Sequence, residues 1–227
     1  MTAQKWEDTT AARRASSRQG HRAPVRDRII QAAAVAIEEN GPDAATSQIA
    51  ELAGVARPHV YRHFSSKEEL LQEVARYAAG SLKDRVLPAL EANGDAVDWI
   101  REPVKQAVEW ASENPGLFLF LMGRNQARDL QRGRAGRSHF LGKIVEAAEA
   151  HLAAVGTVGT AGVPLDALFS GLKGMVDTSI VWWVRHQDEE RDALVDRLSR
   201  QVGLIVQSGL AEHGIAVDET GVVSKFA

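Results

Sequence analysis

The chain has 227 residues, of which 44% are hydrophobic and 25% charged, with a formal net charge of −3 and no cysteine. This composition is typical of a globular protein with a sizeable core. The lack of cysteine excludes disulfides, thiolate zinc sites and cysteine nucleophiles. The longest apolar runs have six residues, whereas a bilayer-spanning helix needs about 20. No apolar segment follows Met1 as a secretion signal would require, so we expect a cytoplasmic protein without a membrane partner.

The charge is distributed unevenly along the chain. Residues 1–67 contain ten basic and seven acidic residues, whereas the remaining 160 contain 17 basic and 23 acidic residues. A basic N-terminal part on an acidic body is typical of a polyanion-binding module attached to a second domain. Such an asymmetry also arises by chance, so it does not by itself identify nucleic acid as the partner.

The first part of the chain predicts a basic arm followed by a helix. Residues 1–22 lack apolar periodicity and indicate a disordered arm. From Val25 the pattern becomes helical, with apolar residues at i, i+3, i+4 and i+7 counted from Ile30. The sequence Asn-Gly-Pro that ends at Pro42 predicts the end of this helix.

Two short helices are then expected, at 46–53 and 57–64. Thr46 is the predicted N-cap of the first, and Gly54 ends it. Ser66 with Glu69 three residues later predicts a capping box that opens a fourth helix. This fourth helix is expected at about 66–92, and further helices are expected at about 95–113, 116–130, 137–155, 164–187 and 189–213. The fold class is therefore all-α, with about nine helices.

The chain divides into two predicted domains. The ranges that we expect are a disordered arm at 1–22, a helix-turn-helix domain at 23–83 with its motif at about 46–65, a second helical domain at 84–215, and a flexible tail at 216–227. Two short helices joined through a glycine turn and braced by a preceding amphipathic helix are typical of a helix-turn-helix unit.

The exposed face of the second short helix carries the functional prediction. If Val60 and Phe64 point inward, the side chains left for solvent or a ligand are Arg57, His59, Tyr61, Arg62 and His63. No acidic residue occurs from Val55 to Lys67, which favours a surface that contacts phosphates and base edges. Lys67, in the first turn of a helix, opposes the helix dipole, and an incoming phosphate would relieve this cost.

A metal site is the alternative function for two of these residues. His59 and His63 are four apart on a helix, a spacing that can chelate zinc. No third ligand is evident in the sequence, so we expect no metal.

Short motifs in this segment occur at characteristic spacings. The stretches 28–41 and 46–70 contain Ile-Ala, Ala-Gly-Val, Tyr-x-x-Phe and Ser-Lys-Glu in that order. In these motifs the chain resembles the DNA-binding domain of the TetR family of bacterial transcriptional regulators. Ala36 and Ile37 stand where that family commonly has Leu and Phe, and Ala56 replaces a frequent Ser or Thr cap. Neither departure removes a DNA contact.

The resemblance implies roles for individual residues. Thr46 and Lys67 match positions that contact the DNA backbone, and Tyr61 and His63 match positions that clamp phosphates. The residues that match base-contacting positions are Ser47, Arg57, Pro58 and His59.

The resemblance also implies a homodimer that binds a palindromic double-stranded DNA operator. The helices at about 164–187 and 189–213 of each subunit would form a four-helix bundle. An apolar stripe (Leu194, Leu198, Val202, Ile205 and Val206) and three glycines (Gly171, Gly174 and Gly203) are compatible with this bundle. The stripe could equally pack within one subunit, because periodicity does not identify the partner.

A small-molecule effector in the second domain is a further implication, with repression as the family's most frequent mode. The candidate ligand-binding residues are Trp99, Trp110, Phe118, Met122, Phe169, Asp177 and Trp183, with Phe120, Phe140, Met175 and Trp182 as additional wall residues. Aromatic walls favour a lipophilic ligand, but aromatic residues of a helical bundle also form its core. Trp182 and Trp183 point about 100° apart on a helix, so only one is expected to face inward.

Two other classes of protein are alternatives to a regulator. The motifs H-E-x-x-H, G-x-S-x-G, the Walker loop and the dinucleotide fingerprint do not occur, so we expect neither an enzyme nor a cofactor. The alternative to a regulator is a helical protein-interaction module without sequence-specific DNA binding.

Overall fold

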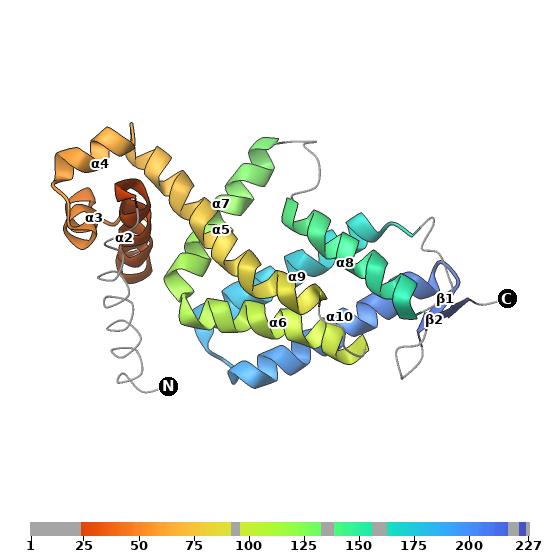
Figure 1. Ribbon diagram of the computed structural model, residues 1–227. Helices are drawn as coiled ribbons and strands as arrows, with labels where there is room; N and C mark the ends of the chain where they lie inside the picture. Colours follow the sequence, from red (N-terminus) through yellow and green to blue (C-terminus); the bar gives the residue numbers. More distant parts are fainter. Residues whose placement is uncertain (1–23, 92–95, 133–138, 156–162, 218–222, 226–227) are drawn as a thin grey trace. The chain divides into compact units, whose positions relative to one another are not determined.

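The computed structural model describes residues 24–91, 96–132, 139–155, 163–217 and 223–225 (Figure 1). Nine helices and two short strands lie in these ranges. The helices are α2 (Val25–Asn40), α3 (Thr46–Ala53), α4 (Arg57–His63), α5 (Lys67–Glu91), α6 (Ala96–Glu113), α7 (Pro115–Arg132), α8 (His139–Val155), α9 (Leu165–His186) and α10 (Arg191–Ala211). The strands are β1 (Ile215–Val217) and β2 (Val223–Lys225). The predicted helical fold is confirmed, and the predicted arm at 1–22 lies outside the described residues.

The two strands correct the expectation of a flexible tail from residue 216. β1 and β2 pair antiparallel, with Ala216 opposite Ser224, and β1 packs against α10. Each strand has three residues, too few for the alternation of polar and apolar residues to signal a strand in the sequence.

The described chain forms two compact units. One comprises the residues up to Ser81 together with Glu113–Gln131, and the other comprises Leu82–Ser112 together with the residues from Arg132 onward. The sequence placed the boundary near the same point of α5 but assigned all of α7 to the second domain. Most of α7 instead groups with the N-terminal unit, because it contacts α2 and the start of α5.

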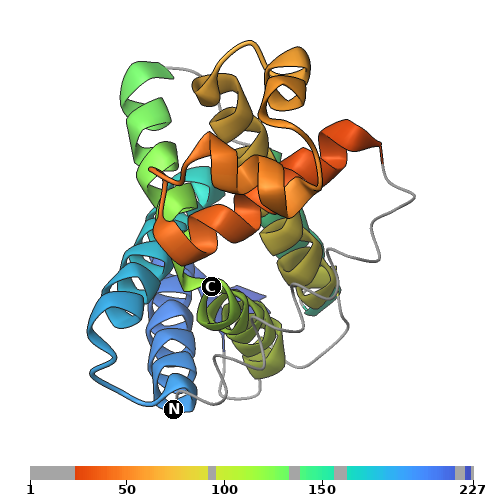
Figure 2. The same ribbon diagram turned by 90° about the vertical axis from the view of Figure 1, so that its left-hand side faces the viewer.

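The N-terminal unit is built on α2, α3 and α4, in which α3 packs against both α2 and α4 (Figure 2). The apolar stripe predicted on α2 is buried, Ile37 included, and Ala36 is buried next to it. Ile49 of α3 joins this core. Ala36 and Ile37, which are smaller than the Leu and Phe common at these positions in the TetR family, therefore still face inward, as their place in the amphipathic pattern requires.

The start of α5 has a modified capping box. The Ser66 hydroxyl accepts a hydrogen bond from the backbone N–H of Glu69 at 3.1 Å, as predicted. The Glu69 carboxylate, however, accepts from the backbone N–H of Ser65 at 2.7 Å and from its hydroxyl at 2.7 Å. The reciprocal bond thus reaches one residue further back than in the usual capping box. It fixes the path of the chain between α4 and α5.

The second unit contains the C-terminal part of α5, most of α6, and the elements from α8 to β2. α9 packs against both α8 and α10. Trp99 of α6 is buried and its indole N–H donates to the carbonyl of Leu90 at 3.1 Å. Among the described helices, none has both the length and the apolar character needed to cross a bilayer.

The apolar stripe of α10 packs mainly within the subunit. Leu194, Leu198, Val202 and Val206 are all buried in the single chain. Gly203 also faces inward, because an added Cβ would lie 3.7 Å from the Cδ1 of Ile100. The intrasubunit alternative left open by the sequence therefore holds for these residues.

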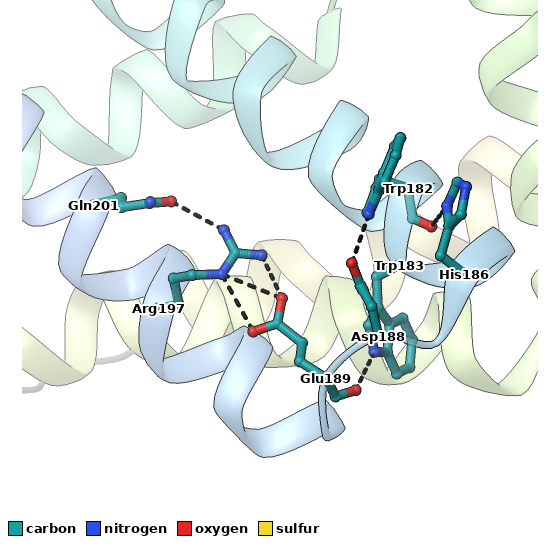
Figure 3. A network of polar contacts seen from close by, with 7 residues as sticks. All are labelled: Trp182, Trp183, His186, Asp188, Glu189, Arg197 and Gln201. Carbon is teal, nitrogen blue, oxygen red and sulfur yellow. Dashed lines mark hydrogen bonds and ion pairs between the residues drawn. The ribbon is translucent and has the colours of Figure 1, made fainter.

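The turn between α9 and α10 is fixed by the two adjacent tryptophans (Figure 3). Trp182 donates its indole N–H to Asp188 at 2.7 Å, and Trp183 donates to the carbonyl of Glu189 at 2.8 Å. The Glu189 carboxylate in turn pairs with Arg197 at 2.5 Å. Trp183 is buried and Trp182 exposed, so the prediction that only one of them faces inward is confirmed.

Candidate nucleic-acid interface

The turn between α3 and α4 has the geometry of a helix-turn-helix. Gly54 adopts the left-handed conformation, with φ 64° and ψ 37°. Its N–H donates to the carbonyl of Glu51 at 3.0 Å, and the N–H of Val55 donates to the carbonyl of Ala50 at 3.0 Å. These two bonds form a Schellman motif, which ends α3 and turns the chain sharply into α4. Glycine adopts this conformation without the strain of a side chain.

The orientation predicted for α4 is confirmed. Val60 and Phe64 are buried, the latter with only 1% of its surface exposed. The exposed side chains of α4 are Arg57, Pro58, His59, Tyr61, Arg62 and His63. Ser47 of α3 is also exposed, whereas Thr46 and Lys67 are half-buried. This basic and aromatic face carries no carboxylate from Val55 to Lys67.

Thr46 does not cap α3 as the sequence predicted. Ala45 occupies the N-cap position and makes no side-chain hydrogen bond, and Thr46 is the first helical residue. The Thr46 hydroxyl instead accepts a hydrogen bond from the phenol of Tyr61 at 3.4 Å. This contact joins the start of α3 to the exposed face of α4.

Hydrogen bonding and positive charge act together on the Tyr61 phenol. Its pKa is lowered from the ordinary value of 10.0, first by the hydrogen bond with Thr46 and then by the hydrogen bond with Arg57. The positive charges of Arg57 and Lys67 contribute in the same direction. Four of the eight predicted DNA-contacting residues therefore interact within one cluster of donors, which suits an anionic ligand.

The acidic residues that follow Lys67 are engaged elsewhere. Glu68 pairs with Arg124 of α7, which lowers the pKa of this carboxyl. The hydrogen bonds from Ser65 lower the pKa of Glu69. Their negative charges are thus partly offset by other partners at the helix start that carries Lys67.

The zinc alternative gains no third ligand. His59 and His63 both lie exposed on α4. Over the ranges that the structure describes, no three His, Cys, Asp or Glu side chains group closely enough to hold a metal ion.

The predicted ligand-binding residues are divided between the two units. Phe118 and Met122 belong to α7 and the N-terminal unit, whereas the other five belong to the second unit. The six apolar candidates are buried. The structure brings Trp99 and Phe169 together, with ring centres 6.5 Å apart in an edge-to-face arrangement. Asp177 instead pairs with Lys173 on the same helix, and burial raises the pKa of its carboxyl.

Two residues near these candidates were missed. The ring of His151 stacks on Trp99, with centres 4.6 Å apart and planes 13° apart, and burial lowers the pKa of this imidazole. His151 and Trp99 are too distant in sequence for a local pattern to connect them. Lys173 could have been found, because it lies four residues before Asp177 on the same helix.

Comparison with known proteins identifies the N-terminal domain. Residues 29–74 match the sequence family described as bacterial regulatory proteins, tetR family. The N-terminal domain therefore belongs to the TetR family. The matched segment contains α3, α4 and the turn between them, so the TetR-family match and the exposed basic face of α4 coincide.

Curated relatives match part of the chain. Over 100 residues, which make up 43% of this chain, it is 33% identical to nucleoid occlusion factor SlmA of Aliivibrio fischeri. Over a match of the same length, it is 30% identical to SlmA of Vibrio cholerae. The chain spans about half (51%) of the length of these relatives.

Solved structures share the TetR-family fold over most of the chain. A tetR-family transcriptional regulator from Streptomyces coelicolor has a TM-score of 0.65 at 19% identity, covering 83% of this chain and 82% of its own. A TetR-like transcriptional regulator from Rhodococcus sp. RHA1 has a TM-score of 0.57 at 17% identity, covering 84% and 97%.

Proposed function

We propose that the protein is a cytoplasmic transcriptional repressor that binds a palindromic DNA operator as a homodimer and is released by a small lipophilic effector. The observation that carries this proposal is the face of α4, which is exposed, basic and aromatic, and free of carboxylates. This face lies within the segment that matches the TetR family. A surface that served only the stability of the fold would have no reason to exclude acidic residues.

The residues of this face would divide between positioning and reading the DNA. Arg57 and His59, at the start of α4, would reach base edges together with Pro58 and Ser47, since the first residues of a recognition helix enter the major groove. Thr46, Tyr61, His63 and Lys67 would contact phosphates. The hydrogen bond between Tyr61 and Thr46 holds both hydroxyl groups in place before DNA binds, which lowers the entropy cost of binding.

Self-association would use apolar side chains that the single chain leaves uncovered. Trp182 of α9 is 56% exposed, and Leu204 and Ile205 of α10 are 60% and 40% exposed. Among the residues that the structure describes, no heavy atom of another segment lies within 4 Å of a Cβ added at Gly171 or Gly174, so a second helix could approach α9 there. A two-fold dimer would present two α4 helices about 34 Å apart, which requires a palindromic operator.

An effector would act by binding the DNA-incompetent state more tightly than the competent one. A coupling of about 1–3 kcal/mol is typical of such regulators. The Trp99 and Phe169 pair offers an apolar, aromatic wall suited to a lipophilic molecule.

Selection from a random duplex pool with the purified full chain tests the proposal. We expect enrichment of one palindromic sequence, and an affinity that falls steeply with salt, by about 0.9 log units per phosphate contact for each log unit of salt. A scrambled duplex of the same composition serves as the control. Enrichment of no sequence at low ionic strength would favour the protein-interaction module instead. Transcription from a promoter that carries the selected sequence then tests repression.

A further inference from the structure

Phe64 anchors the end of α4 in the N-terminal unit. It is the C-cap residue of this helix, and its backbone N–H donates to the carbonyl of Val60 at 3.0 Å. Its ring is almost fully buried. The position of this ring therefore fixes how the last turn of α4 lies on the core.

Arg26 of α2 covers that ring. The guanidinium carbon lies 4.8 Å from the centre of the Phe64 ring, within the range of a cation–π interaction. The same guanidinium donates to the Glu73 carboxylate of α5 at 2.9 Å. One side chain of α2 thus contacts the end of α4 and the first part of α5 at once.

Glu73 has a second partner that makes a matched comparison possible. Arg76 also pairs with the Glu73 carboxylate. Arg76 lies on α5 itself, so its ion pair joins two residues of one helix. Of these two ion pairs of Glu73, the one with Arg26 connects separate helices, and the one with Arg76 does not.

We infer that Arg26 is a positioning residue, which sets the orientation of α4 for DNA through its simultaneous contacts with Phe64 and Glu73. This inference rests on the proposed function, because α4 is taken as the recognition helix. The planar guanidinium is required, since it stacks on a ring with its face while its edge donates to a carboxylate. A lysine would supply the charge without this geometry.

The competing role for Arg26 is direct contact with a DNA phosphate. It belongs to the basic N-terminal part of the chain, and its side chain is partly exposed. The two roles differ in their salt dependence. Loss of a phosphate contact reduces the salt slope of binding by about 1, whereas loss of a positioning contact lowers the affinity at every salt concentration without changing the slope.

The test compares Arg26→Ala and Arg26→Lys with the control Arg76→Ala in the full-length protein. Amide hydrogen exchange of α4 is measured without DNA, and affinity is measured for the duplex selected by the unaltered protein and for a scrambled duplex. For Arg26→Ala we expect about tenfold faster exchange in α4 and about tenfold weaker binding of the selected duplex. The scrambled duplex should be affected less, and the salt slope should stay the same. Arg26→Lys should recover little, and Arg76→Ala should match the unaltered protein.

Three results would overturn the inference. Unchanged exchange in Arg26→Ala would show that α4 does not depend on this residue. A reduced salt slope restored by Arg26→Lys would identify a phosphate contact, and equal weakening of both duplexes would indicate a general loss of folded protein. If the unaltered protein binds no duplex selectively, the proposed function fails, while the exchange comparison still decides whether Arg26 holds α4.

Discussion

The carboxylate of Glu38, on α2, accepts a hydrogen bond from the backbone N–H of Leu117 at 2.8 Å. Leu117 lies in the first turn of α7, so a side chain of one helix satisfies a free N–H at the start of another. Gly116 lies directly against the backbone of Glu38. Arg124 further along α7 pairs with Glu68 at the start of α5. These contacts explain why most of α7 groups with the N-terminal unit.

Replacing Gly116 by alanine should disrupt this contact. A Cβ at this position would lie 2.6 Å from the carbonyl oxygen of Glu38, and a backbone atom cannot move aside as a flexible side chain can. We expect Gly116→Ala to destabilise the protein by about 1–3 kcal/mol in thermal or urea unfolding. Gly123→Ala is the matched control, because it lies on the same helix with open space around it. It should be neutral or stabilising by up to about 1 kcal/mol, and equal behaviour of the two variants would contradict the close approach.

The proposed phosphate contacts predict the behaviour of Lys67→Ala and Tyr61→Phe. Lys67→Ala should weaken binding to all duplexes alike and reduce the salt slope by about 1. Tyr61→Phe should weaken binding about three- to tenfold through the loss of one hydroxyl, with little change in helicity. Tyr77→Phe, which alters another exposed tyrosine, is the control. Unchanged affinity in Lys67→Ala and Tyr61→Phe would refute the phosphate assignment.

Arg57→Ala should have a different signature. If Arg57 contacts a base edge, its loss should cost about 1–3 kcal/mol on the selected duplex and relax the preference at one position of each half-site. Binding of a scrambled duplex should change much less. The measurement is a titration of duplexes that carry each base at each position, and uniform weakening of all of them would rule out a base contact.

The local part of this site was predictable from sequence, and its long-range part was not. Gly54 predicted the turn between α3 and α4, and the four-residue spacing of Val60 and Phe64 predicted which face of α4 is exposed. Both signals depend on residues within one or two helical turns of each other. Thr46 was misassigned as a cap because its partner Tyr61 comes from another helix. Glu38 and Leu117 are 79 residues apart, and no local pattern connects them.

Periodicity also left the partner of α10 undecided. The apolar stripe was recognised, but its burial within the subunit depends on α6 and α9, which the sequence cannot place. Ile205, the remaining residue of that stripe, is exposed together with the neighbouring Leu204.

The proposed dimer predicts that Trp182 is a main contributor to self-association. Its ring is stacked on His186, with centres 3.8 Å apart, and hydrogen-bonded to Asp188, so it loses little freedom when a partner covers it. We expect Trp182→Ala to weaken the dimer about 10- to 100-fold in sedimentation equilibrium. Tyr77→Ala, at an exposed aromatic residue of α5, should leave the dimer unchanged. A dimer constant unaffected by Trp182→Ala would place the interface elsewhere.

The half-buried imidazole of His151 predicts a pH dependence of stability. Burial lowers the pKa of the folded imidazole below its ordinary value of 6.5. Between these two pKa values the unfolded chain binds more protons, so the free energy of unfolding falls as the pH is lowered through that interval. His151→Phe, which keeps a ring against Trp99, should flatten the part of this dependence that begins as the pH falls below about 6.5. His213→Gln, at an exposed histidine, should leave it unchanged, and an unaltered profile for His151→Phe would contradict the assignment.

A photo-cross-linking amino acid placed at position 59 of α4 reports whether this helix enters the DNA. The matched placement is position 149 of α8, which is also exposed but lies in the second unit. With the selected duplex bound, we predict cross-links from position 59 to bases of each half-site and none from position 149. Bound duplex that cross-links to position 149 but not to position 59 would show that α4 is not the recognition helix.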